Sequence, residues 1–313
     1  MSDVVLSARG LTKRYKSKQG VRVAVDALDV DVRRGVVTGF LGENGAGKTT
    51  TLRMFLGLVK PSSGSAVVCG VDVGAGRPLP SRKVGALIES PSAWPWLTAS
   101  EVLRVVARTS GLRSGGDDAS RSALLTRVGL GARAHEAVRG FSLGMKQRLG
   151  LAAALLGDPE VLILDEPMNG LDPVGVVEMR ELLAALANEG RTLFVSSHQL
   201  NELQQLCADV VIVSKGKKRF AGPMSGLSGK QRVRLRVDDV GKARALLEAQ
   251  HRCEVAGAGA DQAIVVDVDH AKAPELARAL VNAGIGLLAL EPVGFDLEAA
   301  FLDVVADKGG GAV

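Results

Sequence analysis

The sequence predicts an α/β fold built on a parallel sheet, followed by a smaller α+β domain. Two patterns lead to this fold class. In the first two thirds of the chain, apolar runs typical of buried strands precede helical segments. Near the carboxyl end, short strands and helices follow one another in the order βαββαβ. A length of 313 residues fits about two domains, and an apolar content of 46% is enough for a buried core.

Composition excludes several classes of protein. No run of about 18 uncharged apolar residues occurs, so we expect no membrane span, and the first residues lack the pattern of a signal peptide. The three cysteines lack metal-ligand spacing and fit a reducing cytosol. The net charge is +5, but only 3% of residues are aromatic, so we expect no nucleic-acid partner. The basic cluster 215–219 is typical of a hairpin turn, and a mild positive charge also suits a membrane-surface or subunit contact.

Residues 1–225 are expected to form one domain that begins with an antiparallel β region. Residues 4–35 alternate in the manner of short strands, with turns at 18–20 and 33–35. Val36–Leu41 is typical of a buried strand, and residues 50–56 begin a helix. Further strands are expected at 65–69, 84–88, 161–164 and 192–196, with a helix at 174–188.

A mainly helical insertion is expected within this domain, at about residues 92–158. Thr98 and Glu101 have the spacing of a capping box, which predicts the start of an amphipathic helix. Ser142 predicts the N-cap of a later helix, and the free N–H groups at such a helix end form an anion site. Between these two helices we expect a loop over 110–120 and a helix over 121–128.

The carboxyl-terminal third is expected to be a separate domain. Residues 226–229 are rich in Gly and Ser and predict a linker. Residues 230–308 predict a small ferredoxin-like α+β domain, in which no cluster of catalytic residues occurs. Residues 309–313 are expected to be a disordered tail. The predicted strands are 232–237, 253–256, 263–268 and 285–290, and the predicted helices are 240–249, 274–282 and 296–305.

The most specific motif is a phosphate loop between a strand and a helix. It consists of Gly42, Glu43, Asn44, Gly45, Ala46, Gly47, Lys48, Thr49 and Thr50. The glycines leave room for backbone N–H groups to wrap a polyphosphate, and the helix N-terminus adds positive potential. Lys48 is expected to reach the β and γ phosphates, and the Thr49 hydroxyl to help hold Mg²⁺.

Two carboxylates and a histidine follow later strands of the same predicted sheet. Asp165 and Glu166 lie at the carboxyl end of a buried strand, where open α/β sheets place their ligands. We expect Asp165 to hold Mg²⁺ and Glu166 to act as base on the attacking water. The alternative is a pair of helix N-terminal charges, but the irregular turn over 167–173 disfavours it. His198 ends the next strand at the same sheet edge and is either structural or a γ-phosphate ligand.

In this order the elements resemble the nucleotide-binding subunit of an ATP-binding cassette (ABC) transporter over about residues 3–225, with a P-loop NTPase core. Tyr15 is similar to the family's aromatic A-loop residue, which stacks on adenine, although it is alternatively a half-exposed strand tyrosine. Residues 142–148 resemble the family signature, residues 169–172 the D-loop, and His198 the switch histidine.

The resemblance implies a mechanism as well as a fold. Two copies would close head to tail around two ATP molecules, so that Ser142, Gly144 and Asp172 of one copy meet the nucleotide of the other. Hydrolysis would open this homodimer and drive a multi-helix membrane permease on another chain. The protein would therefore be cytoplasmic and peripheral on the inner face of the cell membrane.

Two positions depart from the family pattern. Leu143-Gly144-Met145 stands where the signature usually has Gly-Gly-Gln, but Ser142 and Gly144 are kept, so we expect activity. Glu89 stands where the family usually has a glutamine that senses Mg²⁺, which resembles bacitracin- and lantibiotic-type resistance exporters. Glu89 is expected to be a Mg²⁺ ligand, or else a solvent-facing strand end. The domain predicted over 230–308 resembles the C-terminal extension of daunorubicin-type exporter ATPases, which implies dimer contact or regulation.

These features predict the ATPase subunit of a bacterial ABC exporter that drives efflux of an antibiotic or another amphipathic compound. A lipid, polysaccharide or peptide cargo is an alternative, because membrane helices on another chain choose the cargo. A soluble ABC ATPase acting on nucleic acid or ribosomes is a second alternative, but such proteins usually carry two cassettes or long coiled coils. A non-hydrolysing regulatory module is disfavoured by the presence of both Glu166 and His198.

Overall fold

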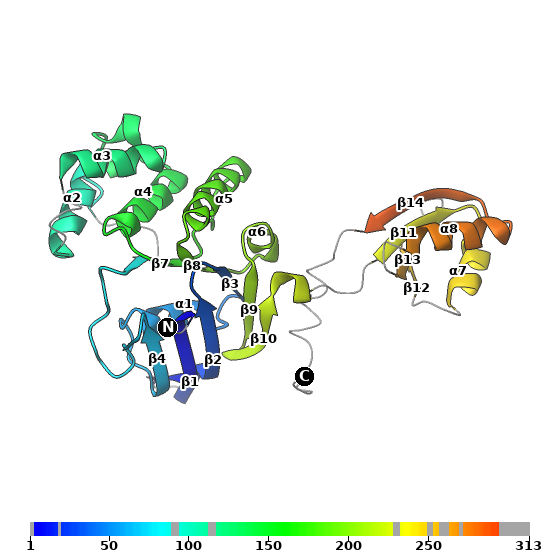
Figure 1. Cartoon of the computed structure of the whole chain (residues 1–313), viewed down its shortest axis with the longest axis horizontal. Coiled ribbons are helices and arrows are strands. Elements are labelled where there is room, and N and C mark those ends of the chain that lie inside the picture. The colour runs from blue at the N-terminus through cyan, green and yellow to red at the C-terminus, as the bar shows by residue number, and fades with distance from the viewer. Residues whose placement is uncertain are drawn as a thin grey trace. The chain divides into compact units, whose positions relative to one another are not determined.

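The computed structural model describes residues 3–17, 20–88, 94–111, 117–227, 232–248, 253–256, 263–268 and 272–293. The chain divides into two compact units, Met1–Met224 and Ser225–Val313. The elements of both units are shown in Figure 1. None of the helices in these described ranges is both long enough and apolar enough to cross a membrane.

The first unit begins with an antiparallel sheet whose strand order is β2-β1-β4-β5. Its strands are β1 (Val4–Ser17), β2 (Gly20–Arg33), β4 (Ser63–Val68) and β5 (Val71–Asp72). The strands over 4–35 are longer than predicted, because β1 and β2 are 14-residue strands that form one hairpin. β1 ends at Ser17 and β2 begins at Gly20, where the first turn was predicted, and β2 ends at Arg33, where the second was predicted. The pairing register shifts at several points, and Gly10 and Ala27 have positive φ. The register shifts therefore mark bulges within the two strands.

The second sheet of this unit has the strand order β10-β9-β3-β8-β7-β6. Its strands are β3 (Val37–Leu41), β6 (Val84–Leu87), β7 (Val161–Asp165), β8 (Thr192–Ser197), β9 (Asp209–Ser214) and β10 (Lys217–Pro223). All pairs are parallel except β9–β10, which form the hairpin predicted around residues 215–219. The prediction that residues 161–164 form a buried parallel strand is confirmed, since β7 pairs in parallel with both β6 and β8.

Six α-helices accompany these two sheets in the described part of the first unit. They are α1 (Lys48–Phe55), α2 (Ala99–Thr109), α3 (Asp118–Arg127), α4 (Leu143–Leu155), α5 (Pro173–Asn188) and α6 (Leu200–Gln204). The capping box before α2 is confirmed, because the Thr98 hydroxyl accepts the Glu101 N–H and the Glu101 carboxylate accepts the Thr98 N–H. The helix predicted at 121–128 starts three residues earlier, because Asp117 caps it by accepting the Ser120 N–H. Helices α2 to α4 share a core of their own.

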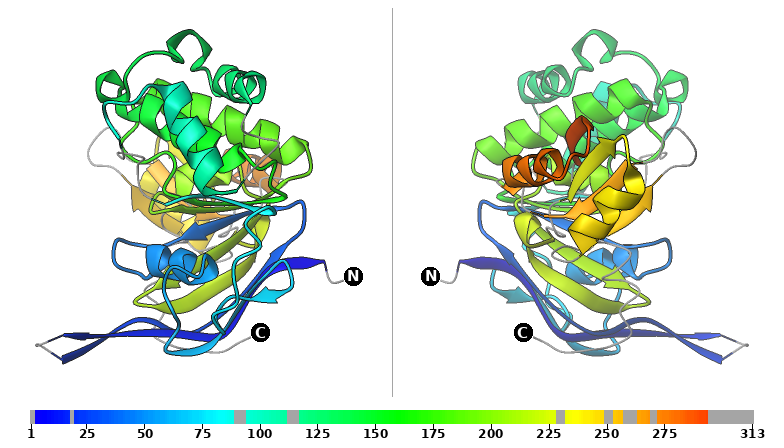
Figure 2. Two further views of the ribbon diagram at one scale, coloured as in Figure 1. Left: turned by 90° about the vertical axis from the view of Figure 1, so that its left-hand side faces the viewer. Right: turned by 90° about the vertical axis from the view of Figure 1, so that its right-hand side faces the viewer.

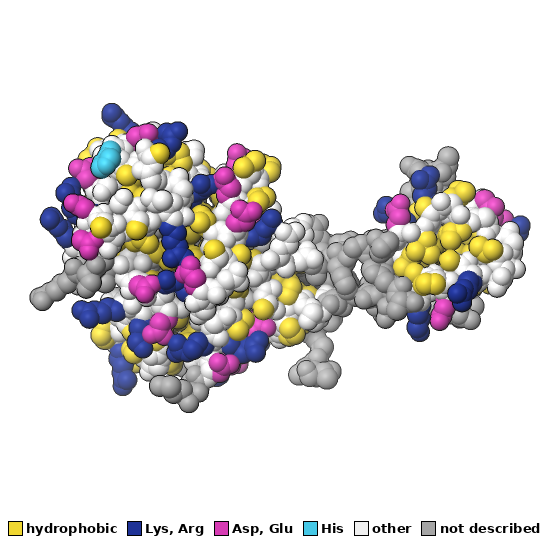
Figure 3. All heavy atoms as spheres, turned by 45° about the horizontal axis from the view of Figure 1, so that its top comes forward, with side chains coloured by type: hydrophobic (Ala, Val, Ile, Leu, Met, Phe, Trp, Pro, Cys, Tyr) yellow, Lys and Arg dark blue, Asp and Glu magenta, His cyan; other side chains and the backbone are white. Residues whose placement is uncertain are grey.

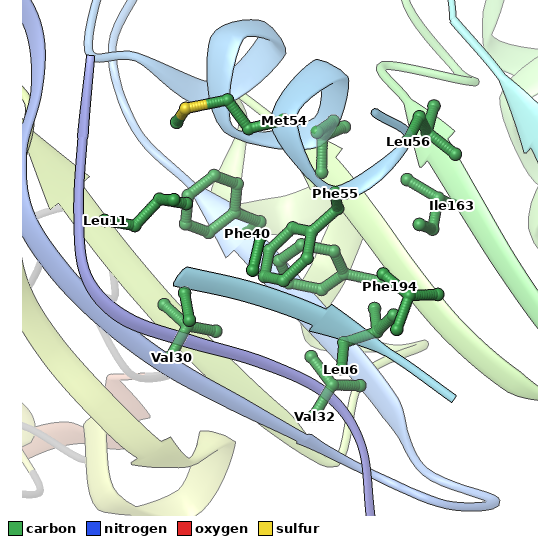
Figure 4. Close-up of a cluster of buried hydrophobic side chains, with 14 of the residues drawn as sticks. Leu6, Leu11, Val30, Val32, Phe40, Met54, Phe55, Leu56, Ile163 and Phe194 are labelled. Atoms are coloured by element: carbon green, nitrogen blue, oxygen red, sulfur yellow. The ribbon is translucent and has the colours of Figure 1, made fainter. Parts of the chain in front are cut away.

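The main core lies between the two sheets and includes one face of α1. Its centre is aromatic. The Phe194 ring lies 5.1 Å from that of Phe40 and meets Phe55 edge-on at 6.0 Å. Figure 4 shows Phe40, Phe55 and Phe194 among the buried side chains of this core. Phe40 is on β3, Phe55 on α1 and Phe194 on β8. This cluster therefore fixes α1, the helix that follows the phosphate loop, against β3 and β8.

The second unit has the predicted βαββαβ order. Its elements are β11 (Arg232–Val237), α7 (Val240–Glu248), β12 (Cys253–Ala256), β13 (Ala263–Asp267), α8 (Ala273–Asn282) and β14 (Leu287–Val293). The strands form an antiparallel sheet in the order β12-β13-β11-β14. The helix predicted at 296–305 and the tail at 309–313 lie outside the described residues.

The segment predicted as a linker has structure in its first half. Residues Met224–Leu227 form a 3₁₀ turn, and the Leu227 side chain is buried. The apolar leucine explains why this half is not an open Gly- and Ser-rich linker, since burying it is favourable. Residues 228 and 229 lie outside the described residues.

Candidate nucleotide-binding site

The phosphate loop connects β3 to α1 and has the backbone that its glycines permit. Gly45 and Gly47 have φ of 82° and 104°, a region that side chains rarely adopt. A Cβ atom on Gly47 would lie 2.4 Å from the carbonyl oxygen of Ala24, so no larger residue fits. No side chain caps the start of α1, which leaves its first N–H groups to a ligand. An anion is the ligand that these groups favour.

The outer side of the loop is fastened to neighbouring strands. The Gly42 N–H donates to the carbonyl of Ser197 at 3.3 Å, and the Gly216 N–H donates to the carbonyl of Ala46 at 3.0 Å. The Ser214 hydroxyl donates to the Glu43 carboxylate at 3.2 Å. Glu43 and Ala46 therefore hold the loop in place, and neither side chain lines the cavity described below.

Lys48 lies at the centre of a charged network. Its ammonium group donates to the Gly42 carbonyl at 2.6 Å and lies 3.1 Å from one carboxylate oxygen of Glu166. The other carboxylate oxygen of Glu166 lies 2.9 Å from Nδ1 of His198. The Lys48 side chain is only 5% exposed, so its charge is balanced here by Glu166 and by carbonyl groups. Glu166 is thus in direct contact with both Lys48 and His198, which are among the residues predicted to carry the chemistry.

Ser196, for which no sequence motif predicted a role, forms hydrogen bonds with both Asp165 and Glu166. Its hydroxyl donates to the Asp165 carboxylate at 2.5 Å and accepts the Glu166 N–H at 2.9 Å. Ser196 is fully buried, and Glu166 has a φ of +46°, which is unusual for a residue with a side chain. The hydroxyl therefore stabilises the turn that directs the Glu166 carboxylate towards Lys48.

A cavity of about 340 Å³ lies beside the loop. Its lining residues are Tyr15, Arg22, Ala24, Asn44, Gly45, Gly47, Lys48, Thr49, Thr50, Arg53 and Glu166. Tyr15 is 40% exposed, and the Lys13 ammonium lies 5.2 Å from its ring centre, a cation–π contact. Three of the lining side chains are cations and one is an anion, so the cavity favours an anionic ligand.

Three lining residues were not predicted from the sequence. Arg53 lies on α1, four residues after Thr49, so helical spacing alone would have found it. Arg22 and Ala24 lie on β2, and only the hairpin register places them beside Tyr15.

The predicted signature and D-loop residues lie elsewhere. Ser142 caps α4 by accepting the Met145 N–H at 3.3 Å, and Asp172 caps α5 by accepting the Gly175 N–H at 2.8 Å. The two turns pack together, because a Cβ atom on Gly144 would lie 3.5 Å from Leu171. None of Ser142, Gly144 and Asp172 lines the cavity. Glu89, the predicted magnesium ligand, lies outside the described residues.

Comparison with known proteins decides the family. Residues 25–169 match the family model of the ABC transporter. The chain is 42% identical to the bacitracin transport ATP-binding protein BcrA of Bacillus licheniformis over 252 residues, which is 80% of each chain. This chain belongs to the ABC transporter ATP-binding proteins. It is an ATPase, and the resemblance inferred from its motifs is confirmed.

Two further comparisons agree with this assignment. The ATPase is 38% identical to the lantibiotic transport ATP-binding protein SrtF of Streptococcus pyogenes over 213 residues, 68% of this chain and 88% of the relative. Its fold is similar to that of cbiO1 from Clostridium perfringens, with a TM-score of 0.62 and 27% identity over 72% of this chain and 91% of the other. The P-loop core predicted from the sequence is therefore confirmed as an ABC ATPase fold.

The oxygen donors of this site suit a magnesium ion. Thr49 supplies a hydroxyl within the cavity, and Asp165 supplies a carboxylate beside Glu166. Magnesium prefers such ligands and usually takes the remaining ones from substrate phosphates and water. Mg²⁺ bound by Thr49 and Asp165 would neutralise charge on the phosphates of ATP.

Proposed function

We propose that this ATPase is the motor of an ABC exporter that expels an antibiotic or another amphipathic compound through a separate membrane permease. The observation that carries the proposal is the 42% identity to a bacitracin transport protein across 80% of both chains. The similarity to a lantibiotic transport protein supports the same class of cargo. Attachment to a permease would hold this chain at the inner face of the cell membrane.

Two copies are proposed to bind two ATP molecules between them. The start of α4, with Ser142 and Gly144, has backbone N–H groups suited to an anion but does not line the cavity of its own chain. It meets a phosphate only if the nucleotide belongs to a second copy. A head-to-tail homodimer satisfies this requirement for both copies at once. Asp172, in the turn packed against Gly144, would lie at the same interface.

The contacts around Lys48 support separate roles for Glu166 and His198 in ATP hydrolysis. When the γ-phosphate of ATP binds near Lys48, it competes with Glu166 for the ammonium group, which frees a carboxylate oxygen of Glu166. This oxygen is proposed to take the proton of the attacking water. His198, in contact with the other carboxylate oxygen, would orient Glu166 and bond the phosphate through its second ring nitrogen. Tyr15 would stack on the adenine.

The second unit is proposed to contribute to dimer contact or regulation. Figure 3 shows hydrophobic side chains gathered on one face of this unit. On the first unit, the same view shows acidic and basic side chains interspersed.

Capture of the permease tests the proposed function. Tagged Glu166→Gln protein, incubated with ATP and detergent-solubilised membranes of the source cell, is purified and its partners are identified by mass spectrometry. Lys48→Ala serves as the matched control that is expected to capture less. A stoichiometric multi-helix membrane protein supports the exporter, and increased sensitivity to bacitracin-like compounds on deletion identifies the cargo class. Ribosomal proteins without a membrane partner would contradict the proposal.

A further inference from the structure

Arg22 lies on the β1–β2 hairpin, and no sequence motif predicts a role for it. The register places Arg22 on β2 directly opposite Tyr15 on β1. Figure 2 shows this hairpin, in dark blue, extending from the rest of the first unit. Residues opposite each other in an antiparallel pair have their side chains on the same face. Arg22 and Tyr15 are accordingly both cavity-lining residues.

The other face of the hairpin carries a different set of side chains. The next pairs are Arg14 with Val23 and Lys16 with Val21, all of which are exposed and none of which lines the cavity. Near its turn the hairpin therefore presents Arg22 to the nucleotide cavity and Arg14 away from it. Arg14 can therefore serve as a control for Arg22, because removing its charge lowers the net charge of the hairpin without removing a side chain from the cavity.

Arg22 also lies close to the phosphate loop. A terminal nitrogen of its guanidinium lies 3.7 Å from the position of a Cβ atom on Gly45. In the described ranges no carboxylate forms an ion pair with Arg22, and the acidic lining residue Glu166 is already in contact with Lys48 and His198. A cation above a phosphate-binding loop without its own acidic partner favours an anion between the two.

We infer that Arg22 binds the phosphate chain of ATP from the hairpin side, opposite the loop and in addition to Lys48. The planar guanidinium fork matches two phosphate oxygens, which an ammonium group does not. Tyr15 and Arg22 then act as a pair from one hairpin, the ring holding the base and the guanidinium holding the phosphates. This inference rests on the assignment of ATP to the cavity beside Lys48.

Nucleotide titrations of single variants test the role of Arg22. Arg22→Gln is expected to weaken ATP binding about tenfold, as loss of a charged hydrogen bond does. ADP binding should weaken by a similar factor and AMP binding by less. Arg22→Lys should recover part of the loss. Arg14→Gln removes the same charge from the opposite face and should leave the ATP dissociation constant within about twofold of wild type.

Three outcomes would overturn the inference. They are unchanged ATP affinity in Arg22→Gln, an equal loss in Arg14→Gln, and an equal loss of ATP and AMP binding, which would place the contact on the nucleoside. Lys48→Ala distinguishes a failure of this inference from a failure of the assignment of ATP to the cavity. If Lys48→Ala loses ATP and Arg22→Gln does not, only the inference fails. If Lys48→Ala binds ATP normally, the cavity itself is wrongly assigned. Arg22 is exposed, so its variants are expected to fold, which circular dichroism checks.

Discussion

Replacing Ser196 with alanine removes the hydroxyl that joins the two carboxylate residues at the end of β7. The change leaves the Glu166 N–H without its partner at 2.9 Å and the Asp165 carboxylate without its donor at 2.5 Å. Leaving a buried polar group unpaired costs about 1–3 kcal/mol, so the free energy of unfolding should fall by about 2 kcal/mol. If a similar energy positions Glu166 in the transition state, kcat falls between about tenfold and a hundredfold. The KM for ATP should change little, because the phosphate loop is intact.

Thr192→Val is the matched control for Ser196→Ala. Thr192 lies at the opposite end of β8, is buried, and accepts the Gly35 N–H at 2.9 Å. Its loss should destabilise the fold by a similar amount but leave kcat unchanged. Urea unfolding followed by circular dichroism measures stability, and steady-state phosphate release measures kcat. A Ser196→Ala protein with wild-type kcat, or a Thr192→Val protein with an equal loss of kcat, would refute the positioning role of Ser196.

Further predictions concern the base, the core and a buried thiol. Glu166→Gln should retain ATP binding while kcat falls by about 10²–10⁴-fold, the usual contribution of a general base, and normal phosphate release would remove Glu166 from that role. Phe194→Ala should lower the free energy of unfolding by about 3–5 kcal/mol, because it empties the centre of the aromatic cluster. A urea midpoint equal to that of wild type would contradict this. Burial raises the pKa of the Cys207 thiol to about 12, so iodoacetamide at about pH 8.5 should alkylate Cys207 only in unfolded protein. Stoichiometric labelling of Cys207 in the folded protein, detected by mass spectrometry, would show that this thiol is accessible.

The parts of the site that depend on neighbours in the chain were predictable. The spacing of glycines around Lys48 determines the loop and the start of α1, and Ser142 caps its own helix. The carboxyl ends of parallel strands meet at one sheet edge, so Glu166 and His198 were expected to be close, and they are in contact at 2.9 Å.

The parts that depend on register between strands were not predictable. Nothing in the sequence distinguishes Ser196 from the other serines. Only the parallel pairing of β7 and β8 sets Asp165 opposite it. Arg22 faces the cavity because the hairpin register sets it opposite Tyr15, and alternation along a single strand does not reveal that register. The sequence likewise did not reveal that each strand of this hairpin is 14 residues long.

The molar mass of Glu166→Gln protein with and without ATP tests the central claim most directly. Light scattering after size exclusion should show one chain of 32.5 kDa without nucleotide and about twice that mass with ATP and Mg²⁺. Ser142→Arg, which places a large side chain at the start of α4, should stay monomeric while still binding ATP. A Glu166→Gln protein that binds ATP stoichiometrically and remains a monomer would contradict the two-copy ATP site.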